Sequence, residues 1–141
     1  MTKTNSFELA NVSTAGSASA TWQLSTLVPM AQEAKPNYKE TVVVCHLSAL
    51  SGTSPTMQFD VYELFDNAWI HVGTTGSMSS PDDRVIDSGG GMTSSGATFS
   101  SGSNTGTLRL LGKGSDLKVV GSTTGTIGTI AFTVALALYD A

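Results

Sequence analysis

The sequence is poor in cysteine and in charged side chains. Cys45 is the single cysteine among 141 residues, so no disulfide can form within the chain, which excludes a disulfide-stapled scaffold. Charged residues make up only 13% of the chain, about half the share of an ordinary soluble domain. The formal net charge is −4, and no dense basic run occurs, so the sequence lacks the electrostatic footprint of a nucleic-acid-binding protein.

Long apolar runs and targeting signals are also missing. The longest apolar run, at 130–139, has about half the length that a membrane helix needs. No basic segment followed by an apolar core stands at the start of the sequence, so no signal peptide is visible. We therefore expect a soluble protein that is made in the cytoplasm and has no membrane partner.

Small polar residues take the place of charge. Serine and threonine each occur 19 times, together 38 of 141 residues, and glycine occurs 15 times. Threonine is β-branched and favours strands, serine and glycine favour turns, and all three are unfavourable inside helices. The length leaves room for one domain with one core. The composition predicts a single all-β domain.

Alternating apolar and polar residues mark the expected strands. The clearest element is a hairpin, in which 56–62 alternates, Asp66-Asn67 supplies a turn and 69–72 returns. The most regular single strand is 130–139. A further strand is predicted at 41–47, where β-branched residues are dense and Val42, Val43 and Val44 are consecutive. Shorter strands are predicted at 84–86, 97–99, 107–111 and 117–120, with one helical turn within 30–39. Seven or eight short strands favour an antiparallel β-sandwich of jelly-roll-like form.

Two polar segments are expected outside this pattern. We predict an extended N-terminal arm at residues 1–20 and the sandwich domain at 21–141. The apolar residues of the arm, Phe7, Leu9 and Val12, either pair as an edge strand of the same domain or contact a neighbouring subunit. Residues 73–107 are rich in glycine and serine, and we predict a long loop there that contacts partners, because ordinary connections are much shorter.

The residues that most often act as nucleophiles are poorly placed. Cys45 and His46 are adjacent on a predicted strand, so their side chains should point to opposite faces and cannot form a thiolate–imidazole pair. His71 falls on a different strand, and the sequence lacks the glycine-flanked serine of a nucleophile elbow. We expect no enzymatic activity.

The carboxylates give no stronger signal. Asp60 and Glu63 would need a cleft between them to act as an acid pair on a glycoside. Asp82, Asp83 and Asp87 offer oxygen ligands for calcium, but their spacing matches no calcium loop, and such clusters are usually solvated loop charges. We expect neither a metal nor a cofactor.

Aromatic residues are the remaining candidates for a binding surface. A platform for sugars would draw on Trp22, Tyr38, Tyr62, Trp69 and Tyr139. We expect instead that Trp69 anchors the core beside the hairpin and that Tyr62 is an exposed strand residue or an interface contact.

The order of short motifs resembles that of a known group of virion proteins. The motifs begin with Leu50-Ser51-Gly52-Thr53-Ser54-Pro55-Thr56, followed by Phe59-Asp60-Val61-Tyr62-Glu63 and Ala68-Trp69-Ile70-His71-Val72-Gly73. They continue with Leu117-Lys118-Val119-Val120, the turn at 121–126 and Ile130-Ala131-Phe132-Thr133-Val134-Ala135-Leu136. This order, over about residues 40–139, resembles the small β-sandwich virion proteins of tailed bacteriophages, especially capsid decoration (cement) proteins. The arm and the long loop depart from their compact pattern.

The resemblance implies a structural protein that binds the outside of a phage capsid and reinforces it. Its partners would be the major capsid protein and further copies of the chain in a homotrimer or another symmetric oligomer, on the capsid surface after synthesis in the host cytoplasm. No catalytic residues carry over. The candidate capsid or inter-subunit contacts are Phe7, Leu9, Val12, Tyr62, Arg84 and Tyr139.

Two other functions remain open. A carbohydrate- or receptor-binding β-sandwich of a phage tail or fibre predicts a cluster of exposed aromatic residues with Asp or Asn nearby. A small hydrolase predicts a pocket that unites His46 or His71 with a carboxylate.

Overall fold

A computed structural model of the chain describes residues 4–38, 40–87, 91–94, 98–100 and 111–139. Its strands are β1 (Thr4–Ala15), β2 (Ala20–Gln23), β3 (Glu40–Phe65), β4 (Ala68–Thr74), β5 (Asp82–Ile86), β6 (Gly91–Ser94), β7 (Thr98–Ser100) and β8 (Leu117–Tyr139). The short helices are α1 (Leu24–Leu27), α2 (Pro29–Ala34) and the 3-10 turn η1 (Lys35–Asn37). All strand pairs are antiparallel, which confirms the all-β class. Within the described ranges, every helix is too short to cross a bilayer.

Two long strands, β3 and β8, form the centre of the fold. They pair along their whole length, from Glu40 opposite Tyr139 to Glu63 opposite Leu117. The sheet order is β1-β8-β3-β5-β6-β7, with β2 also paired to β8 and β4 also paired to β3. The expectation of many short strands is therefore wrong at two places. The predicted segments 41–47 and 56–62 belong to one strand, and 117–120 and 130–139 belong to another.

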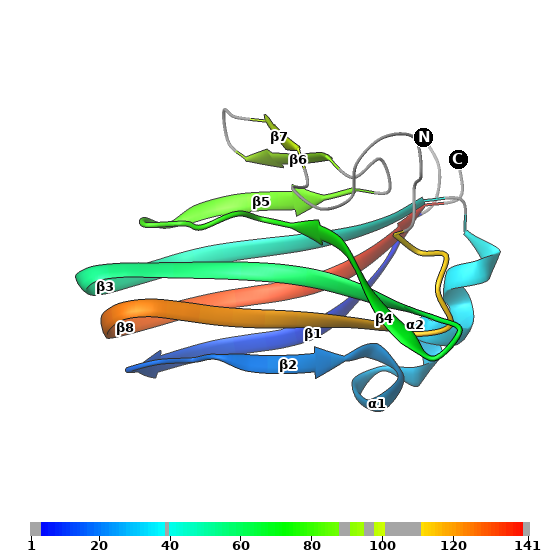
Figure 1. Cartoon of the computed structure of the whole chain (residues 1–141), viewed down its shortest axis with the longest axis horizontal. Helices are drawn as coiled ribbons and strands as arrows, with labels where there is room; N and C mark the ends of the chain where they lie inside the picture. Colours follow the sequence, from blue (N-terminus) through cyan, green and yellow to red (C-terminus); the bar gives the residue numbers. More distant parts are fainter. Residues whose placement is uncertain (1–3, 39, 88–90, 95–97, 101–110, 140–141) are drawn as a thin grey trace.

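Both central strands bend sharply at the same point, and Figure 1 shows them turning back at one end of the molecule. We call residues 48–56 of β3 and 122–129 of β8 the bend. Its backbone has positive φ at Gly52 (138°), Ser54 (47°) and Gly125 (76°). A Cβ on Gly52 would lie 1.9 Å from the Thr126 carbonyl oxygen, and one on Gly125 would lie 2.0 Å from that of Ser54. Glycine is needed at both positions, because it alone has the conformation and the space.

The bend brings the two halves of the sheet face to face, with the core between them. Phe59 in one half contacts Phe132 in the other, with ring centroids 5.0 Å apart and an edge-to-face angle of 72°. Trp22 of β2 adds a second edge contact to Phe132 at 5.6 Å. The remaining fully or nearly fully buried apolar side chains alternate along the same strands and include Val43, Cys45, Leu47, Met57, Val61, Leu117, Val119, Ile130, Val134, Leu136 and Leu138.

The first strand belongs to this sheet. β1 pairs with residues 129–139 of β8, so the first of the two alternatives for the arm, an edge strand of the same domain, describes residues 4–15. A register shift between Glu8 and Ala10 turns both Leu9 and Ala10 inward, and each is only 6% exposed. Phe7 and Val12 pack against the core from the same strand.

The segment 73–107 is less irregular than its composition predicts. It contains the end of β4 and the strands β5, β6 and β7, because residues 43–47 of β3 offer a free edge to which β5 pairs and β6 and β7 follow. The predicted strand 84–86 lies within β5, and 97–99 overlaps β7. The predicted strand 107–111 lies outside the described residues except for Leu111, which is a buried turn residue.

The hairpin is as predicted. Asp66 and Asn67 both have positive φ, at 48° and 65°, which is the two-residue turn that matches the twist of paired strands. Residues 29–37 supply the expected helical turn as α2 and η1.

Candidate functional site

The outer face of β3 near the hairpin carries a group of aromatic and polar side chains. Alternation along β3 buries Phe59 and Val61 and turns Asp60 and Tyr62 outward. The two-residue turn places His71 opposite Tyr62, and β8 places Lys118 on its other side. We call this set of residues from three adjacent strands the aromatic face: Gln58, Asp60, Tyr62, Trp69, His71 and Lys118.

The centre of the aromatic face is a cation between two rings. The Lys118 ammonium lies 4.5 Å from the ring centroid of Trp69 and 5.5 Å from that of Tyr62. The Tyr62 ring meets His71 edge to face, with centroids 5.1 Å apart. Within the described part of the chain, these ring contacts are the interactions of the Lys118 ammonium, and neither the Tyr62 hydroxyl nor the Trp69 indole N–H has a hydrogen-bond partner. The face therefore presents three polar groups that can donate to a ligand.

The rim of the aromatic face is held by hydrogen bonds. The His71 Nε2 lies 2.9 Å from the Asp60 Oδ1, and the Gln58 amide donates to both oxygens of the same carboxylate at 2.9 and 3.1 Å. The side chains of His71 and Asp60 are 22% and 16% exposed. Asp60 is thus fixed in place, and it fixes His71 against Tyr62.

This arrangement corrects the expectation for Trp69. Trp69 pairs with Leu64, and Leu64 lies two residues from Tyr62 on β3, so both point to the same face of the sheet. The Trp69 ring therefore lies on the outer face rather than in the core. Trp22 fills the core position instead. The outward orientation of Trp69 could have been predicted from the sequence, because a two-residue turn at 66–67 fixes which residues of the two strands face each other. Two other aromatic candidates lie elsewhere: the Tyr38 hydroxyl accepts from Asn5 beside the core, and Tyr139 ends β8 opposite Thr4.

Asp60 and Glu63 point in opposite directions, so they form no acid pair. Glu63 is fully buried and lies 2.7 Å from the equally buried Lys35 ammonium. The backbone amides of Gly112 and Gly114 also donate to the Glu63 carboxylate. Burial raises the pKa of Glu63, and the contacts with Lys35 and the two amides lower it in part. This pair, which the sequence did not reveal, joins η1, β3 and the loop before β8.

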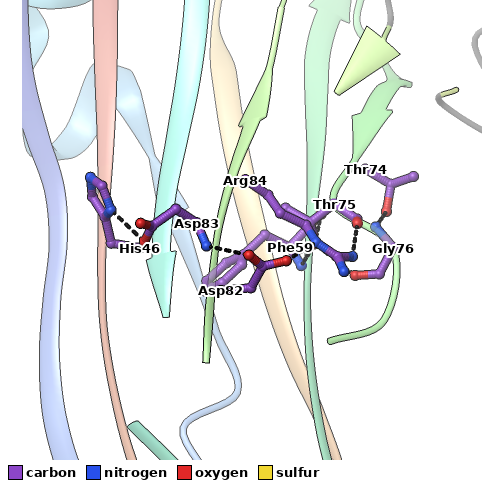
Figure 2. A network of polar contacts seen from close by, with 8 residues as sticks. All are labelled: His46, Phe59, Thr74, Thr75, Gly76, Asp82, Asp83 and Arg84. Carbon is purple, nitrogen blue, oxygen red and sulfur yellow. Dashed lines mark hydrogen bonds and ion pairs between the residues drawn. The ribbon is translucent and has the colours of Figure 1, made fainter. Parts of the chain in front are cut away.

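A second polar network spans β5 and the segment after β4 (Figure 2). Arg84 donates from Nε to Asp82 at 3.0 Å and from Nη1 to the Thr75 carbonyl at 2.7 Å. Asp83 binds the His46 Nδ1 at 2.7 Å on the exposed surface. The side chain of Arg84, a predicted contact, is only 13% exposed and is engaged within the chain.

Asp82, Asp83 and Asp87, which we weighed as calcium ligands and did not expect to bind a metal, form no shared site. Asp82 binds Arg84 and Asp83 binds His46. The described residues contain no group of three histidine, cysteine or acidic side chains that could hold a metal ion.

Cys45 and His46 face apart, as alternation predicts. Cys45 is fully buried and His46 is exposed. Burial raises the pKa of the Cys45 thiol far above its ordinary value, so the thiolate is disfavoured. The histidines do meet carboxylates, His46 with Asp83 and His71 with Asp60, but Cys45 is directed away from His46.

The bend forms a second candidate surface. Residues 48–56 and 122–129 contain no charged side chain, and the turn at 16–19, which joins β1 to β2, lies against 121–128. Hydroxyls pair across it, as between Ser51 and Thr129 at 2.7 Å. We call the exposed residues of these three segments the bend surface; they include Ser17, Ser19, Ser48, Ser51, Thr53, Ser54, Ser122, Thr124, Thr126 and Thr129.

Comparisons of the chain with protein-family models, with curated proteins and with solved structures gave no match. The aromatic face and the bend surface are therefore the features of this chain from which its function can be inferred.

Proposed function

We propose that the chain is a capsid decoration protein, a non-catalytic virion protein that binds the outside of a phage capsid and reinforces it. The observation that carries this proposal is the bend surface. It is exposed, lined by hydroxyls and free of charge. Charged side chains are depleted at the centres of protein interfaces because their desolvation is costly, whereas hydroxyls keep hydrogen-bonding options in any orientation. Such a surface is suited to close contact with another protein.

The architecture is consistent with a reinforcing role. We propose that the doubled sheet is a jelly-roll-like β-sandwich, in which the halves of β3 and β8 supply the two layers. The edge-to-face contact of Phe59 with Phe132 locks these layers together. A rigid body that loses little conformational freedom on docking binds with a smaller entropic penalty.

The β1 edge offers a route to self-association. Among the described residues, β1 pairs on one side only, with β8, and its 12 residues carry one charged side chain, Glu8. An edge strand with so little charge and no proline can add a strand from a neighbour through backbone hydrogen bonds. We propose that copies of the chain meet at this edge in a symmetric oligomer, such as a homotrimer. Phe7, Leu9 and Val12 support the strand from its core side.

A single added charge tests the docking proposal. Thr126→Lys places an ammonium on the exposed bend surface, and burying it against a partner should weaken capsid binding by roughly tenfold or more. The measurement is occupancy on purified capsids that lack the protein, over a concentration series. Thr26→Lys adds the same charge on α1, outside the bend surface, and serves as the control. Equal occupancy for the wild type and Thr126→Lys would exclude the bend surface as the docking site.

Deletion of residues 1–20 is a poor test of docking. It removes the buried Leu9 and the whole pairing of β1 with β8, so the fold itself would be weakened. Point changes on exposed residues separate attachment from folding.

A carbohydrate- or receptor-binding role is the second candidate. It predicts exposed aromatic residues next to an aspartate or asparagine, and the aromatic face groups Tyr62 and Trp69 with Asp60. The two roles use different parts of the molecule and are compatible in one virion protein.

A further inference from the structure

We infer that the aromatic face is a binding site for a neutral carbohydrate, with Trp69 and Tyr62 as the surfaces on which the sugar packs. This inference goes beyond capsid attachment, because the residues involved lie outside the bend surface. It assigns one ligand class to the face and identifies the groups that contact it.

The aromatic and polar groups of the face match the chemistry of a sugar. A pyranose presents C–H groups that pack on an aromatic ring and a rim of hydroxyl oxygens that accept hydrogen bonds. The face supplies both partners. Trp69 and Tyr62 supply two rings, each with one side against the Lys118 ammonium and one side left for a sugar, and the donors are that ammonium, the Tyr62 hydroxyl and the Trp69 indole N–H.

The charges of the face favour a neutral ligand. Lys118 contributes one positive charge and Asp60 one negative charge, so their sum is zero when His71 is neutral. A nucleic acid needs an excess of basic side chains, which neither the face nor the chain as a whole has. A peptide strand would add to a sheet edge, but Tyr62 lies on β3 between β4 and β8, where both edges of the strand are paired.

The site is already ordered before a ligand arrives. Its side chains come from three hydrogen-bonded strands, and the link from Gln58 through Asp60 to His71 holds the imidazole against Tyr62. The Lys118 ammonium fixes the Trp69 ring by a cation–π contact. A preorganised site of this kind loses little entropy on binding.

The position of the aromatic face allows the protein to bind a sugar while the bend surface is docked on a capsid. Trp69 and Tyr62 lie beside the hairpin turn at 66–67, and Figure 1 shows this hairpin at the opposite end of the molecule from the bend. With the bend surface on a capsid, the aromatic face would remain accessible to sugars on a cell surface.

The experiment starts with the full chain on an array of neutral and acidic glycans. The strongest neutral binder is then titrated calorimetrically against the wild type and three variants. We expect Trp69→Ala to lose roughly tenfold or more in affinity and Tyr62→Phe to lose less, because it removes one hydroxyl and keeps the ring. The control is Ile70→Ala, because Ile70 is next to Trp69 on β4, points to the other face of the sheet and is 40% exposed. This variant should bind as the wild type does.

Each outcome bears on the inference directly. It is overturned if no neutral glycan binds above background, or if Trp69→Ala binds as tightly as the wild type while its circular dichroism and melting temperature are unchanged. Binding confined to acidic glycans and abolished by moderate salt would also overturn it, because Lys118 alone would then account for the affinity. The capsid variant Thr126→Lys should retain glycan binding, so failure of capsid docking and failure of this site are distinguishable.

Discussion

At the scale of single residues, the buried pair of Lys35 and Glu63 is the least expected feature. Both side chains are fully buried, and the Glu63 carboxylate is also bound by two backbone amides. Gly114 is required there, because a Cβ would lie 2.9 Å from the Glu63 Oε1. Buried ion pairs add little net stability over apolar residues, but removing one partner leaves a costly unpaired charge.

Lys35→Met should therefore destabilise the protein strongly and in a pH-dependent way. Without the ammonium, the pKa of Glu63 rises further than burial already raises it. The folded state then favours the protonated acid, so the loss of stability is largest above the folded pKa and disappears as the pH falls toward the unfolded value of about 4.3. We expect the variant to lose about 3 to 5 kcal/mol in unfolding free energy at about pH 8, and clearly less at about pH 5, by urea denaturation.

The double variant Lys35→Met/Glu63→Leu is the matched control. It removes both charges, so it should be more stable than Lys35→Met at about pH 8 and should lack the added pH dependence. A deficit of the single variant that does not change with pH would contradict this account of Glu63.

Single-residue patterns predicted some of these environments and missed others. The opposite orientations of Cys45 and His46 follow from strand alternation alone. Lys35 lies in a polar segment and Glu63 near a strand end, where charges are ordinarily solvated. Their burial arises because η1 and the loop at 112–114 close over the same end of β3, a tertiary contact that no local pattern encodes.

At the scale of elements, the bend explains why pairs of segments that the sequence predicts as separate strands are continuous in β3 and in β8. Alternation at 56–62 and 130–139, and the dense β-branched residues at 41–47, were sufficient to predict strands there. The continuity of β3 and β8 was not predictable, because serine, glycine and proline at 51–55 are equally typical of a loop between separate strands. The ladder passes through these residues by register shifts at Gly52 and between Thr53 and Thr56.

Gly52→Ala tests whether the bend requires glycine. The added Cβ would collide with the Thr126 carbonyl, at a φ that side-chain-bearing residues rarely adopt, so we expect a loss of about 2 kcal/mol or more in unfolding free energy. Gly128→Ala is the control, because its nearest new contact is the Ser51 hydroxyl at 3.1 Å and its φ is not positive. Thermal or urea unfolding of both variants measures the difference, and equal losses would show that bend strain is not the cause.

At the scale of the whole molecule, the position of β8 governs folding. β8 lies between β1 and β3 in the sheet, although in the chain it begins about a hundred residues after the end of β1 and about fifty after the end of β3. Sheets that depend on such distant pairings fold slowly, because the loop must close before contacts form.

Dividing the chain before β8 should show that the fold depends on this strand. We expect a fragment of residues 1–116 to lack a cooperative thermal transition, since β1 and β2 have no other strand to pair with in the described fold. Addition of a peptide of residues 117–141 should restore the transition. A cooperative transition in the fragment alone would show that β8 is dispensable for the core.

The pairing of Thr4 with Tyr139 has a practical consequence. These residues face each other in register at the end of the sheet away from the bend (Figure 1). A peptide or enzyme fused at either end of the described chain would start from this corner, directed away from any surface that the bend contacts. A short linker from Tyr139 to Thr4 would also close the backbone into a ring. The protein is thus suited to carry a fused cargo at this corner.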